Sequence, residues 1–177
     1  MIGRQLFPDK YRDVPEDVLR KAAERGTMIH SICELVDDMG ITHDSDEAQG
    51  YKELKDDWGL RYECSEYLVS DNEHYASCID KVYRENETDF TLGDIKTTYV
   101  LDKESVRWQL SIYAYFFELQ NPGCNAVRLI GIWLRGKNHE IVEVERISSE
   151  IVINLLKCEF GRQTVCESLF HIPCYSS

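Results

Sequence analysis

The sequence contains no apolar run near the roughly 18 residues that a membrane-spanning helix requires. Its first five residues, Met1 to Gln5, also lack the apolar centre of a signal peptide. It has no helicase motif, no internal repeat and no low-complexity tract. We therefore expect a cytoplasmic protein without a membrane partner.

Close cysteine pairs are also missing, because the seven cysteines include no Cys-x-x-Cys motif. Without a secretion signal, most cysteines are expected to be reduced, and buried ones behave as small hydrophobes. The even spacing of Cys158, Cys166 and Cys174 invites an iron-sulfur cluster with Cys33 or Cys64 as the fourth ligand. Steps of eight residues do not match the tight spacings of common clusters, so an iron-sulfur cluster is disfavoured.

An excess of basic residues is absent too. The chain has 20 Lys and Arg against 32 Asp and Glu, a net charge of -12, whereas nucleic-acid-binding proteins usually present a basic surface. Residues 34–80 hold 14 acids and three bases, which leaves 18 acids and 17 bases elsewhere. Because the acidity is regional, the remaining basic residues can still form a DNA-facing surface: Arg84, Lys96, Lys103, Arg107, Arg128, Arg135 and Lys137.

What is present fits one domain over residues 1–177, with a sizeable core and 43% hydrophobic residues. After an irregular arm over residues 1–13, periodicity predicts a helix that Asp13 caps and that ends near Gly26. A second helix capped by Thr27 would bury Met28, Ile29, Ile32, Leu35 and Val36. An acidic, solvated helix is expected over residues 43–58.

Alternation and apolar runs then predict strands, with a helix between the third and the fourth. The strands are expected at Tyr62 to Ser70, His74 to Arg84, Phe90 to Thr98, Ala126 to Leu134 and Glu140 to Ile147, and the helix at Glu104 to Gln120. A final helix would begin at Ser148 or Ser149 and reach about Gln163. This order indicates a mixed α/β domain.

The most informative motif is Asp94-Ile95-Lys96 on the third strand. Asp94 and Lys96 are two residues apart, so they project from one face while Ile95 points into the core. Their charges would lose hydration there unless something compensates them, as a metal ion and a phosphate would. A strand-end ion pair explains the same residues, and Glu53-Leu54-Lys55 repeats the spacing in a solvated setting.

Other residues complete a candidate site. A short hairpin would place Asp80 beside Asp94, where two carboxylates repel unless a cation or a proton is shared. Gln109 and Tyr113 share one face of their helix and can reach back over the strands. His30 and Glu66 are weaker candidates, since each has an ordinary structural explanation. Lys103 and Arg107 could add phosphate contacts.

In this order, these residues resemble the RecB-like branch of the PD-(D/E)XK nuclease superfamily, which includes phage exonucleases. The similarity runs from Gly26-Thr27-Met28-Ile29-His30 through Glu66 and Ile79-Asp80 to Gly93-Asp94-Ile95-Lys96-Thr97 and Gln109-x-x-x-Tyr113, about half of the chain. It implies a restriction-endonuclease-like core with a mixed central β-sheet flanked by helices. A glycine common before the second-strand aspartate is replaced in Ala76-Ser77-Cys78.

The resemblance also implies roles for the site residues. His30, Asp80, Asp94 and the carbonyl of Ile95 would bind Mg²⁺ or Mn²⁺, and Lys96 would align or activate the attacking water. Gln109 and Tyr113 would support the lysine. Glu66 is a candidate for a second metal ion or for positioning water.

The expected function is therefore a metal-dependent DNA nuclease, in particular an exonuclease acting on linear duplex or single-stranded ends in recombination, repair or phage DNA processing. Self-assembly or a recombination-protein partner is expected by analogy with phage exonucleases. Two alternatives stay open. One is a catalytically silent relative that uses its acidic face as a nucleic-acid mimic or for a basic partner, and the other is a nuclease that carries an iron-sulfur cluster.

Overall fold

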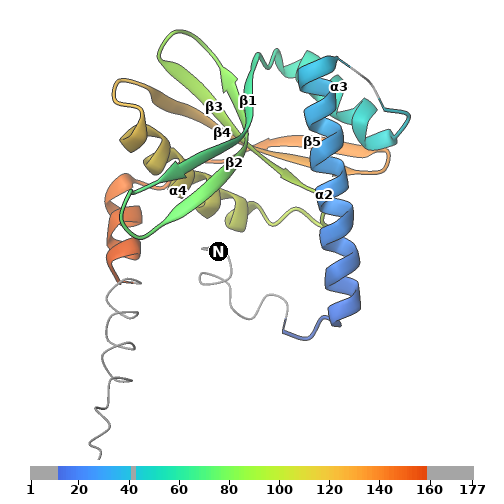
Figure 1. Ribbon diagram of the computed structural model, residues 1–177, viewed down its shortest axis with the longest axis horizontal. Helices are drawn as coiled ribbons and strands as arrows, with labels where there is room; N and C mark the ends of the chain where they lie inside the picture. Colours follow the sequence, from blue (N-terminus) through green and yellow to red (C-terminus); the bar gives the residue numbers. More distant parts are fainter. Residues whose placement is uncertain (1–11, 41–42, 159–177) are drawn as a thin grey trace, which may run out of the picture.

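The structure, a computed structural model, describes residues 12–40 and 43–158, and these form an α/β fold around a five-stranded mixed sheet (Figure 1). The strands are β1 (Tyr62–Ser70), β2 (Ala76–Arg84), β3 (Asp89–Lys96), β4 (Asn125–Arg135) and β5 (Asn138–Glu143). They lie in sequence order, and only the β3–β4 pair is parallel. The predicted class, a mixed central sheet flanked by helices, is confirmed.

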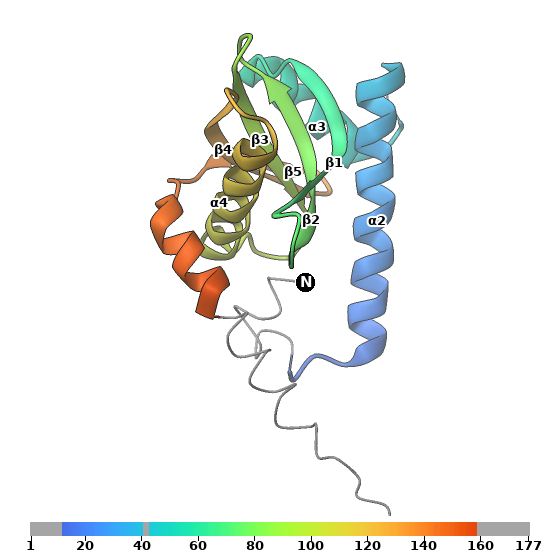
Figure 2. The same ribbon diagram turned by 60° about the vertical axis from the view of Figure 1, so that its left-hand side comes forward.

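Helices cover both faces of the sheet. The first two, α2 (Glu16–Met39) and α3 (Asp46–Trp58), pack on one face, while α4 (Lys103–Gln120) and a helix over residues 149–158 pack on the other. Figure 2 shows α2 and α4 on opposite sides of the sheet. Because α4 connects β3 to β4, it provides the crossover that parallel neighbours need.

The prediction of two N-terminal helices was wrong, because α2 runs without a break from Glu16 to Met39. Gly26, the expected end, lies inside it. A glycine in a helix interior costs only about 1 kcal/mol relative to alanine, and the buried side chains of Ile29, Ile32, Cys33 and Val36 anchor the following turns. Thr27 is likewise internal and caps nothing, and Pro15 rather than Asp13 holds the N-cap position.

Two residues of the predicted apolar stripe on α2 are exposed. Met28 is 56% exposed and Leu35 41%, whereas Ile29, Ile32 and Val36 are buried as expected. The predicted stripe was too wide because it included Met28 and Leu35. It also omitted Cys33, which is fully buried.

The acidic helix α3 is not solvated all round as predicted. Ser45 caps it by accepting a hydrogen bond from the N–H of Ala48, and the helix buries Ala48, Tyr51 and Leu54 against the α2 side of the sheet. Its many acids hid these three positions, which recur at helical spacing.

The remaining elements follow the predictions closely. The bounds of β1 match, and α4 begins one residue early, after Asp102 accepts the N–H of Ser105. The second strand starts later than predicted because the Asp71 carboxylate accepts three successive N–H groups, from residues 73, 74 and 75. The third strand ends at Lys96 and the fifth at Glu143, both short of their predicted ends.

Some predictions fall outside the described residues. Nearly all of the expected N-terminal arm does, as does the continuation of the last helix beyond residue 158. In the part of the chain that the structure describes, no helix is both long and apolar enough to cross a membrane.

Candidate metal centre

The site lies where β1 and β2 bend together. Ile79 packs on the α4 side of the sheet, yet Lys81, two residues on, reaches Asp37 of α2 on the other side. Opposite them, Tyr67 stacks near Phe117 of α4, while the Ser65 hydroxyl accepts from Lys81. Residues two apart on a regular strand share a face, so both strands switch faces at the residue between.

Those two intervening residues are Glu66 and Asp80. The register pairs Ser65 with Lys81 and Tyr67 with Ile79, which leaves Glu66 opposite Asp80. Glu66 has a φ of 51°, a left-handed conformation that is uncommon for a residue with a side chain. The bend therefore sets two carboxylates side by side in a crease of the sheet.

The next strand adds Asp94. Lys81 pairs with Gly93 in the antiparallel β2–β3 ladder. Asp80 comes directly before Lys81 and Asp94 directly after Gly93, so the two aspartates are neighbours, as predicted. The Asp80 Oδ2 atom accepts a 2.7 Å hydrogen bond from the N–H of Ile95, which fixes the carboxylate against β3.

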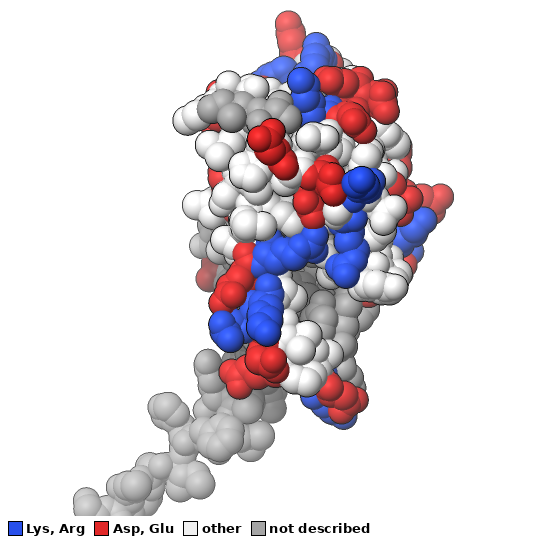
Figure 3. Space-filling model, turned by 90° about the vertical axis from the view of Figure 1, so that its right-hand side faces the viewer, with Lys and Arg blue, Asp and Glu red and all other residues white. Residues whose placement is uncertain are grey.

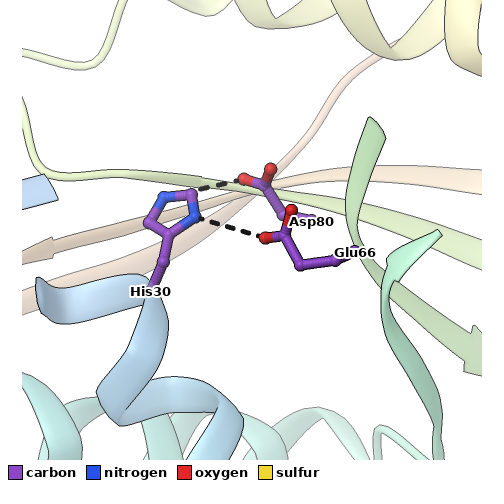
Figure 4. A group of neighbouring side chains, drawn as sticks. All are labelled: His30, Glu66 and Asp80. Atoms are coloured by element: carbon purple, nitrogen blue, oxygen red, sulfur yellow. Dashed lines mark ion pairs between the residues drawn. The ribbon is translucent and has the colours of Figure 1, made fainter. Parts of the chain in front are cut away.

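His30 reaches this crease from α2, as Figure 4 shows. Its Nε2 atom lies 3.8 Å from Asp80 Oδ2 and 3.3 Å from the carbonyl oxygen of Ile95. Its Nδ1 atom faces Glu66, with 3.9 Å between Nδ1 and Oε1. The two ring nitrogens thus look toward different partners.

This arrangement fits a divalent cation. One donor atom each from His30, Glu66 and Asp80 lies within 4.8 Å of the others, and two atoms that bind one ion at about 2.1 Å can be up to about 4.2 Å apart. The distances from Nε2 to Asp80 Oδ2 and to the Ile95 carbonyl oxygen, 3.8 and 3.3 Å, satisfy that limit. Glu66 stands at the other ring nitrogen, where a carboxylate orients a metal-binding imidazole.

The protonation state of His30 suits this role. Burial lowers the pKa of His30, although Asp94, the Ile95 carbonyl and Glu66 act in the opposite direction. At neutral pH the imidazole is therefore neutral, the form in which histidine binds a metal ion.

Asp94 takes part in a different set of contacts. Its Oδ1 atom accepts from Lys96 Nζ at 2.9 Å and from Gln109 Nε2 at 2.6 Å. Gln109 also accepts from Lys96 at 3.2 Å and donates to the Tyr113 hydroxyl at 2.9 Å. The strand pair and the α4 pair that the sequence indicated are thus joined in one network, with the Gln109 amide at its centre.

One atom of this network lacks a hydrogen bond. Asp94 Oδ2 is buried and, among the described residues, no group donates to it, although Lys96 Nζ is 2.7 Å away at an unfavourable angle. Buried carboxylate oxygens are normally satisfied, so this atom is available to an additional ligand.

The pKa shifts of Asp80 and Lys96 indicate that the site would favour a bound cation. Burial, followed by the negative charge of Asp94, raises the pKa of Asp80 well above its usual range. Lys96 is the one ammonium in contact with Asp94 in the described chain. Burial acts to lower its pKa, but Asp94 and then Asp80 outweigh it and the net pKa is raised, so Lys96 stays protonated.

Two residues beside the site were not singled out by the sequence. Burial and a bond to Glu66 raise the pKa of Cys78 to about 12, so its thiol keeps its proton and donates to Glu66 Oε2 at 3.1 Å. Burial raises the pKa of Tyr113, and Ser77 beside its hydroxyl acts to lower it. The sequence indicated neither role, since both residues were noted only within Ala76-Ser77-Cys78 before Asp80.

The structure does not bring Arg107 to this site. Arg107 lies two residues from Gln109, which is about 200° around the helix, and its guanidinium contacts the Glu145 carbonyl and Glu104. Lys103 is exposed at the start of α4.

The predicted basic surface is partly neutralised. Arg84 pairs with Glu63, and Arg128 with Glu85. Figure 3 shows that, on the side covered by α2, a short band of Lys and Arg lies among groups of Asp and Glu. No continuous basic face is visible from this side.

The sequence also concealed a buried charge network beside the site. The Asp37 side chain is fully buried and contacts both Lys55 and Lys81, while Tyr51 donates to it at 2.7 Å. Lys81 is only 2% exposed. The sequence did contain one signal of this network. Lys81 follows Asp80 directly and precedes the apolar Val82 and Tyr83, and a lysine in such a strand is rarely buried unless it is paired.

The cysteines give no cluster within the described residues. Cys33 is buried in the core, Cys64 is half-buried and Cys158 is exposed. Cys166 and Cys174 lie outside the described residues, so the expectation about an iron-sulfur cluster stays a prediction.

Comparison with known proteins adds the fold and nothing finer. No family model matches the sequence, and no curated protein matches it. Among solved structures, the crystal structure of SSO0001 is similar, with a TM-score of 0.50 over 90% of this chain and 70% of that chain. The two sequences are 15% identical over that match, a level that indicates a shared fold alone.

Proposed function

We propose that the protein is a divalent-metal-dependent nuclease that hydrolyses phosphodiester bonds in DNA, with exonuclease action on linear ends as its expected mode. The observation that carries the proposal is the meeting of two adjacent carboxylates, the partly buried Asp80 and the fully buried Asp94, with a neutral imidazole and one ammonium. Two adjacent carboxylates repel each other, and a bound cation would offset this repulsion.

His30, Asp80 and the Ile95 carbonyl would hold Mg²⁺ or Mn²⁺, and Asp94, the neighbour of Asp80 on β3, is a further candidate ligand through its Oδ2 atom, which accepts no hydrogen bond among the described residues. The oxygen-rich set with one nitrogen suits either ion, and manganese accepts nitrogen more readily. When bound, the ion would screen the phosphate charge and acidify water.

The protein's own residues supply the rest of the chemistry. Because Lys96 stays protonated, it serves as a charged donor to the phosphoryl oxygens, where negative charge develops, rather than as a base. Gln109 holds Lys96 against Asp94, and Tyr113 holds Gln109. Glu66 and Cys78 fix the side chain of His30 from behind.

End-labelled linear DNA and closed circular DNA, incubated with and without Mn²⁺, test this proposal. We expect metal-dependent digestion of the linear substrate alone. Lys96→Ala and Asp94→Ala should lose the activity, with the exposed Lys52→Ala on α3 as the control that retains most of it. Full metal-dependent cleavage by either of the first two variants would refute the proposal.

A further inference from the structure

The loop that follows Lys96 is fixed at its base by side chains from two other elements. Arg25 of α2 donates to the Thr97 carbonyl at 3.2 Å, and Trp133 of β4 donates to the Thr98 carbonyl at 2.8 Å. Arg135 reaches the same Thr97 carbonyl at 3.5 Å. The loop base is therefore held in place beside the candidate metal centre.

The tip of this anchored loop is apolar and open. Tyr99 is 79% exposed and Val100 is 69% exposed. The Arg135 guanidinium lies over the Tyr99 ring, with 4.8 Å between Cζ and the ring centroid. One ring face is thus supported by a cation, while the high exposure leaves the other accessible. An exposed aromatic ring beside a cation is the kind of surface on which nucleobases stack.

Cations lie beside the ring. Arg135 forms no ion pair with a carboxylate in the described part of the chain, and the exposed Lys137 follows two residues later, although Glu47 accepts the N–H of Gly136 between them. Tyr99 itself is three residues from Lys96, so their Cα atoms are at most about 11 Å apart. A ligand on the ring would therefore lie near the candidate metal centre.

We propose that Tyr99, supported by Arg135, stacks against an unpaired nucleobase of single-stranded DNA. Stacking on an aromatic ring beside a cation is how single strands are held without sequence preference. A duplex hides its base faces, so the ring would select a single strand or a frayed end. This inference rests on the proposed nuclease function and names its substrate as single-stranded DNA.

The test is fluorescence anisotropy of a labelled oligo-dT strand and a blunt duplex, measured in EDTA so that no hydrolysis occurs. Tyr99→Ala should weaken binding of the single strand about tenfold, the loss expected for one stacked base, and should leave duplex binding unchanged. Tyr99→Phe should keep wild-type affinity, because it keeps the ring. Leu68→Ala removes an equally exposed apolar side chain, 72% exposed on β1, and should change nothing.

Single-strand binding that is indifferent to Tyr99→Ala would overturn the proposal and would leave the loop as a surface for a protein partner. An equal loss on both substrates would overturn it too. The nuclease proposal is judged separately, by hydrolysis in Mn²⁺. If binding depends on Tyr99 but no hydrolysis occurs, the nuclease proposal fails and the stacking site stands. If hydrolysis occurs but binding does not depend on Tyr99, the stacking site fails and the nuclease proposal stands.

Discussion

At the scale of single residues, the site places two like charges together where burial opposes them. Asp80 and Asp94 are neighbours on β2 and β3, and Lys96 compensates one of them through direct contact. The raised pKa of Asp80 expresses the cost of keeping both charges. Carboxylates chosen for stability alone would not be placed in this way.

That cost gives a prediction for Asp80→Asn. Because the folded pKa of Asp80 is raised, its ionisation removes stability as the pH rises from its usual pKa of about 4 through the raised value. In EDTA at pH 8, we expect Asp80→Asn to melt a few degrees above the wild type, since about 1 kcal/mol shifts Tm by roughly 2–4 °C in a chain of this size. The advantage should vanish near pH 4.

Thermal melts at the two pH values measure this. Glu63→Gln is the control, because the pKa of Glu63 is lowered by Arg84 and its charge does not oppose folding. Mn²⁺ should raise the Tm of the wild type and not that of Asp80→Asn. A less stable Asp80→Asn protein at pH 8 would contradict the account.

Gln109 gives a second prediction at this scale. Gln109→Ala should lower kcat by about 10- to 100-fold, as the loss of groups that orient a site does, because Lys96 and Asp94 would lose their common partner. Metal affinity should change little, since Gln109 contacts none of the proposed ligands His30, Asp80 and Ile95. Single-turnover hydrolysis measures the effect on kcat, and Mn²⁺ titration measures the effect on metal affinity. If Gln109→Ala lost Mn²⁺ affinity but kept the wild-type rate at saturating metal, Gln109 would belong to the metal site instead.

At the scale of elements, the buried Asp37 network joins the helix that carries His30 to the strand that carries Asp80. Asp37 lies seven residues after His30, two turns along the same face of α2, and Lys81 follows Asp80 on β2. Asp37→Ala would leave Lys55 and Lys81 without their carboxylate, at a cost of about 3–5 kcal/mol.

Urea unfolding tests this prediction with a neighbouring control. Asp38 is exposed and bonds the Tyr62 hydroxyl at the surface, so Asp38→Ala should cost less than about 1 kcal/mol. Equal effects of the two substitutions would mean that the buried network does not hold the site together.

The continuity of α2 is a separate prediction. A Cβ on Gly26 would meet only Thr97 Oγ1, at an ordinary contact distance of 3.6 Å. Gly26→Ala should therefore stabilise the protein by roughly 0.5–1 kcal/mol, because alanine is the better helix former. Destabilisation in the same urea assay would indicate that the helix breaks at this residue.

Local patterns predicted most elements but not their partners. Alternation located β1 and apolar spacing located α4, because both signals depend on neighbours in the chain. The Asp94–Lys96 and Gln109–Tyr113 pairs followed from the same periodicities. The Asp37–Lys81 pair and the bend at Glu66 could not, since they depend on contacts between residues far apart in sequence.

At the scale of the whole molecule, most of the regional acidity lies on the surface. Of the acids in residues 34–80, the Asp37 side chain is fully buried and that of Asp80 is 14% exposed, while Glu47 and Glu63 pair with arginines. The basic band in Figure 3 likewise lies among acids. DNA would therefore be held by a few placed groups, and its binding should depend only moderately on salt.

The metal centre itself is the claim on which the others depend, and anomalous diffraction from crystals grown with Mn²⁺ tests it most directly. We predict one peak in the crease, within about 2.3 Å of His30 Nε2 and an Asp80 carboxylate oxygen. The peak should be lost in His30→Ala. A crease without manganese, or manganese bound only at other surfaces, would contradict the account.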